Sequence, residues 1–165
     1  MKKLILAAAV VFGFAGMSFA QSSTANASVT VNTNVVSSIS CSNTHNLDLG
    51  TVVQGATASV APTSANAGAF TVTGTLNSSV SYVFAAPADL TSGANTLTFT
   101  PDIPVYNTSN SQTGTNPFGA VAGGIMSLGA GVTSVYIWVG GSVTPSATQA
   151  VGSYSGSYTL TVTYQ

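Results

Sequence analysis

Hydrophobic and polar residues alternate along most of the chain after residue 26. Within 27–35 the apolar positions are Ala27, Val29, Val31 and Val35, and every residue between them is polar, so the apolar set lies on one face of a strand. The same period recurs in 70–72, 80–84, 97–99, 135–139 and 154–164. Clusters of Gly, Pro, Asn and Ser separate these runs, and none of them has a helical period. The pattern predicts an all-β protein, folded as an antiparallel β-sandwich.

The doublet Val35-Val36 interrupts the alternation, as a bulge or a break between two strands would. We therefore divide the chain here. Residues 21–35 are expected to form an N-terminal strand or extension, and residues 36–165 the β-sandwich domain. Within the domain, 107–124 lacks periodicity and is rich in Asn, Ser, Thr and Gly, which predicts a long surface loop.

The first residues have the three-part pattern of a signal peptide. Lys2 and Lys3 precede an uncharged apolar run over 4–14, and Ser18-Phe19-Ala20 offers small residues to a signal peptidase. The apolar run is shorter than the roughly 20 residues of a membrane-spanning helix. We therefore expect a helical signal peptide of residues 1–20, cleaved near Ala20. The mature chain would have no membrane span and would reach the periplasm, the cell surface or the extracellular space.

Charge is almost absent from the mature chain. The only Lys and Arg residues of the full sequence are Lys2 and Lys3, which lie in the expected signal peptide. After cleavage three acidic residues remain and no Lys or Arg. Nucleic acids and anionic membrane surfaces are bound through clustered Lys and Arg, and this composition excludes them as electrostatic partners. Low charge also disfavours free monomers at high concentration, which favours an assembled state.

Catalytic and metal-binding chemistry has few candidate residues. Cys41 and His45 could form a nucleophile and base, but four residues along a strand separate them by about 13 Å unless a turn intervenes. Asp48, Asp89 and Asp102 are isolated and lack calcium-loop spacing, and zinc would need more His or Cys residues. We expect no enzyme activity, no metal and no cofactor.

Tyr136 and Trp138 are the candidate ligand surface. They share the face opposite Val135, Ile137 and Val139, so they either form an exposed aromatic platform for a glycan or lie in the core of a central strand.

Three stretches resemble a known family. They are LDLGTVVQG at 47–55, VGGSV at 139–143 and GSYSGSYTLTVTY at 152–164. In order and spacing they are similar to the motifs of a family of secreted bacterial domains catalogued as domain of unknown function 4402. Leu49 stands where that family more often has Phe. The resemblance implies an immunoglobulin-like sandwich without an assigned activity, and the family is itself similar to fimbrial, pilin-like subunits.

The fimbrial similarity sharpens the question of what residues 25–35 do. Their apolar positions Ala25, Ala27, Val29, Val31 and Val35 either pair within the chain as a first strand or form a strand donated to the next subunit. The expected function is a secreted structural or adhesive subunit of a surface fibre, pilus or extracellular matrix. Its partners would be further copies or other surface subunits. The alternative is an extracellular module that binds a glycan or a protein.

Overall fold

The computed structural model describes residues 24–35, 38–119, 123–129 and 131–165. The chain divides into two units, Met1–Asn34 and Val35–Gln165. In the first unit the described residues 24–34 are exposed and form no strand. The expected signal-peptide helix falls within 1–23, outside the described residues.

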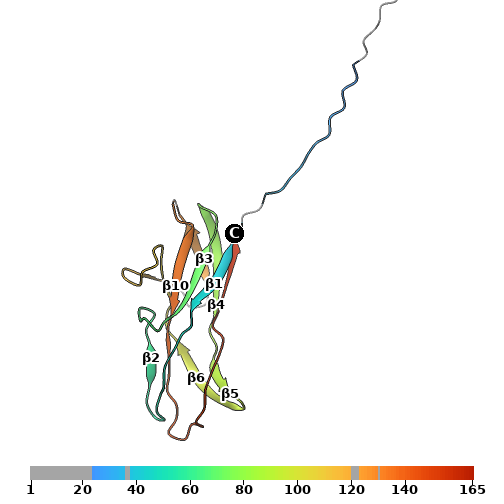
Figure 1. The fold of residues 1–165 in the computed structure, drawn as a ribbon. Coiled ribbons are helices and arrows are strands. Elements are labelled where there is room, and N and C mark those ends of the chain that lie inside the picture. Colours follow the sequence, from blue (N-terminus) through green and yellow to red (C-terminus); the bar gives the residue numbers. More distant parts are fainter. Residues whose placement is uncertain (1–23, 36–37, 120–122, 130) are drawn as a thin grey trace, which may run out of the picture. The chain divides into compact units, whose positions relative to one another are not determined.

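The second unit is built of β-strands, and its described residues contain no helix (Figure 1). The strands are β1 (Ser40–His45), β2 (Ala58–Val60), β3 (Gly68–Thr73), β4 (Ser78–Ala85), β5 (Asp89–Ser92), β6 (Asn95–Pro101), β7 (Val105–Asn107), β8 (Asn116–Pro117), β9 (Gly124–Leu128), β10 (Ser134–Val139), β11 (Gly141–Val143) and β12 (Thr159–Tyr164). All the strand pairs are antiparallel. The all-β, antiparallel class predicted from the alternation is therefore confirmed.

The strands form a β-sandwich-like arrangement of three sheets. One sheet has the order β1-β3-β10-β7-β8, the second β2-β11-β6-β5, and the third β12-β4-β9. Strands β10 and β11 are separated only by Gly140, so the chain passes directly from the first sheet to the second. A Cβ at Gly140 would collide with the carbonyl oxygen of Val60, and glycine is therefore required where the chain changes sheets.

The main core lies between the first and third sheets. Alternate side chains of β3, β4, β9, β10 and β12 meet there, as the period-two pattern requires. Its buried members are Phe70, Val72, Val80, Tyr82, Phe84, Phe118, Met126, Leu128, Val135, Ile137, Val139 and Leu160. A smaller cluster of Leu97, Phe99 and Val143 continues the core under the second sheet.

The segment 107–124 is not a simple surface loop, which corrects the sequence prediction. Residues 116–117 form β8, and the next residue, Phe118, is 4 % exposed and packs against Tyr82 with ring centroids 4.6 Å apart. The Gln112 side-chain amide also donates hydrogen bonds to the carbonyl oxygens of Pro62 (3.0 Å) and Ser64 (2.8 Å). The Phe118 ring and the hydrogen bonds of Gln112 therefore fix this segment to the rest of the domain, although the segment has no hydrophobic period.

Candidate functional site

Two sheets end at strands with one unpaired edge each. Among the described residues, β1 pairs with β3 and β12 pairs with β4, and neither has a partner on its other side. Such an edge presents a row of free N–H and C=O groups to any further strand. The two edges belong to different sheets, and the chain continues from β1 and toward β12 through segments outside the strands.

Tyr164 closes one end of this space. Its hydroxyl donates to the carbonyl oxygen of Ser38 (2.7 Å) and accepts from the backbone N–H of Thr75 (2.7 Å). The end of β12 is thereby fixed beside the residues that lead into β1. The segment that contains β1 and the segment that contains β12 run in opposite directions from this point. No backbone pairing joins these two described strands to each other.

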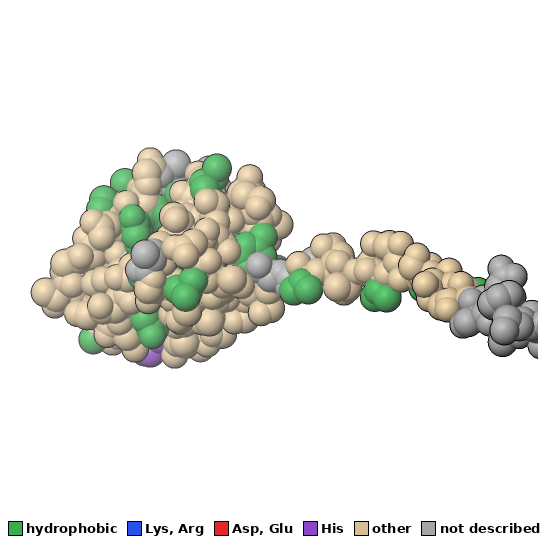
Figure 2. Space-filling view, turned by 90° about the horizontal axis from the view of Figure 1, so that it is seen from above, with side chains coloured by type: hydrophobic (Ala, Val, Ile, Leu, Met, Phe, Trp, Pro, Cys, Tyr) green, Lys and Arg blue, Asp and Glu red, His purple; other side chains and the backbone are tan. Residues whose placement is uncertain are grey.

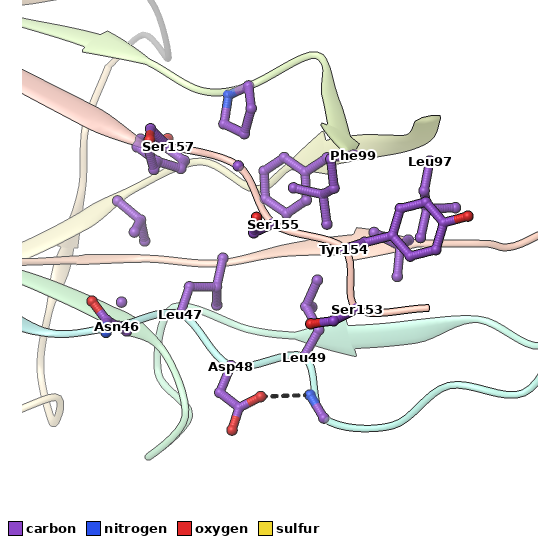
Figure 3. A pocket seen from close by; sticks show the side chains of 18 of the residues that line it. Asn46, Leu47, Asp48, Leu49, Leu97, Phe99, Ser153, Tyr154, Ser155 and Ser157 are labelled. Atoms are coloured by element: carbon purple, nitrogen blue, oxygen red, sulfur yellow. Dashed lines mark hydrogen bonds between the residues drawn. The ribbon is translucent and has the colours of Figure 1, made fainter. Parts of the chain in front are cut away.

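A groove of about 840 Å³ occupies the open part. One wall is residues 46–52, which follow β1, and the other is residues 152–158, which precede β12 (Figure 3). Its floor consists of core side chains from four strands, namely Phe70, Leu97, Phe99, Val139 and Val143. These floor side chains are at most 8 % exposed, because side chains of the two walls pack over them.

The first wall is apolar toward the groove and polar on its other side. Leu47 and Leu49 point toward the space between the walls, whereas Asp48 points away (Figure 3). The Asp48 carboxylate accepts a hydrogen bond from the backbone N–H of Gly50 at 2.8 Å. Gly50 has φ +69°, a left-handed conformation that glycine adopts without strain. The turn keeps the one charged residue of this wall out of the groove.

In the second wall every second residue is glycine or tyrosine, in turn, and the residues between them are serines. Tyr154 and Tyr158 pack against the Leu97–Phe99–Val143 cluster. A Cβ at Gly156 would lie 2.8 Å from Leu90 Cδ2, and one at Gly152 would lie 2.7 Å from Ser92 Oγ. The glycines let this wall approach β5, to which Ser155 is joined by a bridge to Thr91.

Tyr158 carries the one buried side-chain polar atom without a hydrogen-bond partner in the described part of the chain. Burial, together with the negative charge of Asp102, raises the pKa of the phenol from 10.0 to about 12. The hydroxyl therefore stays protonated at every physiological pH.

Among the described residues no hydrogen bond joins the candidate nucleophile Cys41 to the candidate base His45. Cys41 and His45 both lie on β1, where His45 Nδ1 is 2.8 Å from the carbonyl oxygen of Ala67. Burial raises the pKa of the Cys41 thiol, which disfavours the reactive thiolate. In the described residues no three His, Cys, Asp or Glu side chains are close enough to hold a metal ion.

The candidate ligand pair divides between core and surface. Trp138 is 6 % exposed and packs with Val60, Ala67 and Ala69 on the outer face of β3 and β10. Tyr136 is half-buried, and its ring stacks on that of Trp138 at 6.5 Å between centroids. Trp138 is thus a core residue, covered by the connection between β2 and β3.

The predicted assembly residues are exposed. Val29, Val31 and Val35 are each 87 % exposed, and Ala25 and Ala27 are also exposed. Figure 2 shows hydrophobic side chains spaced along this segment among polar ones, and no Lys, Arg, Asp or Glu side chain is visible on the face of the domain in this view. Sequence reasoning missed the groove, although two of the quoted motifs, at 47–55 and 152–164, contain its walls.

Fold and groove define the class: an all-β, β-sandwich-like domain with a groove between residues 46–52 and 152–158. No helix among the described residues is long and apolar enough to cross a membrane. The family model described as Domain of unknown function (DUF4402) matches residues 8–164, and the chain belongs to this family. No curated protein matches the chain.

Proposed function

We propose that this protein is an exported structural subunit that assembles with further copies into a surface fibre, pilus or matrix. The observation that carries the proposal is the groove between 46–52 and 152–158. Its two walls run in opposite directions over a floor of core side chains, and the half-buried Leu47 and Leu49 point into the space between them.

The groove is unfavourable for a free monomer. Leu47, Leu49 and Val52 are only half-buried along its first wall, and each would gain about 25 cal/mol for every Å² of apolar surface removed from water. A further strand placed between the walls would cover this apolar surface, which is what an assembly contact supplies.

Composition and resemblance agree with this function. A mature chain with only three charged side chains, all acidic, has little charge repulsion between identical copies. The motifs resemble a family similar to fimbrial subunits, so we assign the sandwich to the immunoglobulin-like, pilin-like type. Export rests on the signal-peptide pattern of residues 1–20. N-terminal sequencing of secreted protein should find Gln21 first, whereas material that begins at Met1 would contradict export with cleavage.

Assembly is tested on the mature chain by light scattering and electron microscopy. Ser157 is exposed on the second wall, so Ser157→Asp adds a charge to the groove without removing a core side chain. The matched control is Ser127→Asp, at an exposed position of β9 that is not part of the groove. We expect wild type and Ser127→Asp to assemble and Ser157→Asp to remain monomeric. A wild-type chain that stays monomeric, or a Ser157→Asp chain that assembles normally, would refute the proposal.

An extracellular glycan-binding or protein-binding module is the second candidate. Ser153, Ser155 and Ser157 bring neutral hydroxyl groups to the groove beside Tyr154, which is a composition suited to sugars. A glycan array separates the candidates, because a sugar site in the groove predicts a signal from monomeric protein that Ser157→Asp removes.

A further inference from the structure

We propose that the groove of one copy binds residues 25–35 of a second copy as an added strand, with Ala27, Val29 and Val31 facing the groove floor. The inference rests on the proposed function, since it names the partner of the same groove.

The chemistry of the segment matches that of the groove. Residues 24–35 contain no charged side chain, and their apolar positions all fall on one parity, with Ser28, Thr30 and Asn32 on the other. A strand with this alternation presents one apolar face, which fits the half-buried Leu47 and Leu49 that point into the groove, and one polar face toward water.

The backbone of the segment is available for pairing. Residues 24–35 are exposed and form no strand. Because the walls run in opposite directions, an inserted strand is antiparallel to one and parallel to the other, and both arrangements satisfy backbone hydrogen bonds.

The groove accepts part of the segment. Residues 25–35 would span about 36 Å as a strand, and the first wall, residues 46–52, would span about 23 Å at the same rise. The groove is therefore long enough for about seven residues of the segment, which include Ala27, Val29 and Val31.

The inference determines the symmetry of the assembly. The contact joins the N-terminal segment of one copy to the groove of the next, so each copy has one free segment and one free groove. Such a heterologous contact repeats into an open filament unless the rotation closes a ring.

The test compares neighbouring substitutions of opposite parity in the mature full chain. Val29→Asp places a carboxylate in the apolar groove, whereas Thr30→Asp places one on the solvent face. Both residues are exposed in the free chain, so neither substitution disturbs the folded domain. We expect Val29→Asp to raise the concentration required for assembly about tenfold or more, and Thr30→Asp to change it less than about threefold.

A synthetic peptide of residues 24–35 provides the second measurement. Added to the monomeric Val29→Asp chain, it should raise the melting temperature, because it binds the folded state alone. A peptide carrying the same Val29→Asp change should have no effect.

The outcomes separate this inference from the proposed function. If Ser157→Asp abolishes assembly while Val29→Asp and Thr30→Asp both assemble like wild type, the groove is the assembly site but residues 25–35 are not its partner. Equal loss of assembly in the Val29→Asp and Thr30→Asp chains would contradict the proposal that Val29 faces the groove and Thr30 faces the solvent. If the wild type does not assemble and the peptide has no effect, both proposals fail.

Discussion

At the scale of single residues, the quoted motifs describe the walls of the groove. In the 152–158 wall, tyrosines reach the core and the intervening glycines allow contact with β5. In the 46–52 wall, two leucines face inward, and the Asp48–Gly50 turn keeps the carboxylate outside. These roles explain why glycine, tyrosine and leucine recur at a spacing of two.

Tyr158→Phe should stabilise the domain. The phenol hydroxyl is buried without a partner, so its removal should raise the free energy of unfolding by about 1 kcal/mol at pH 7. Tyr154→Phe is the contrast. The Tyr154 hydroxyl donates to the Ala150 carbonyl oxygen at 2.7 Å, so its removal should lower the free energy of unfolding by about 1 kcal/mol. Urea unfolding of both variants measures the difference, and equal destabilisation would contradict the assignment.

The raised pKa of Tyr158 has an alkaline signature. The unfolded phenol loses its proton near pH 10, whereas the folded one retains it to about pH 12. The folded state binds more protons in this interval, so wild-type stability should fall as the pH rises from 10 to 12. Tyr158→Phe should fall less steeply in a series of unfolding curves over that range; identical slopes would show that Tyr158 does not cause the loss.

Gly50→Ala tests the turn of the first wall. A Cβ there meets no atom within 4 Å, but φ is +69°, so the substitution should cost about 1 kcal/mol through backbone strain alone. Gly129→Ala is the control, since it also has open space and no positive φ, and it should leave the melting temperature unchanged or slightly higher. Thermal unfolding compares the two variants, and an equal effect would argue against strain at Gly50.

At the scale of elements, the long alternating runs were predictable and the short strands were not. The runs 70–72, 80–84, 97–99 and 135–139 lie in β3, β4, β6 and β10, because one apolar face against a core imposes period two. Strands β2, β7, β8 and β11 have two or three residues each, too few to show a period. The run 27–35 alternates just as clearly but forms no strand, since pairing depends on a partner strand that the local pattern does not contain.

Phe118 illustrates the limit of sequence patterns within 107–124. It follows a two-residue strand in a polar segment, yet it contacts Tyr82, Phe84 and Tyr106 in the core. Phe118→Ala should lower the free energy of unfolding by about 3–5 kcal/mol. Ile125→Ala, at a side chain that is 68 % exposed, should change it by less than about 0.5 kcal/mol. Similar values in denaturant unfolding would show that the anchor carries little stability.

At the scale of the whole molecule, the groove could not be predicted because it lies between segments about a hundred residues apart in the sequence. Walls 46–52 and 152–158 become neighbours only through the sheet order, in which β1 and β12 end opposite layers. The absence of cations and the alternation of 25–35 led to the expectation of assembly, which stays a prediction. The groove is the surface that we propose for this assembly contact.

Deletion of residues 21–31 should separate folding from assembly. We expect a monomeric chain with the β-sheet circular dichroism of the wild type, because the described part of the deleted segment forms no strand within its own chain. An unfolded product would mean that the segment pairs in cis. Filaments that persist after the deletion would mean that it is not the donated strand.

Hydrogen exchange on assembled and monomeric mature protein tests the central claim most directly. Filling of the groove predicts that backbone amides of 46–52, 152–158 and 25–35 exchange more slowly in the assembled wild type than in monomeric Val29→Asp protein, while amides of β9 exchange alike in both. Assembled protein in which both walls exchange as fast as in the monomer would contradict the account.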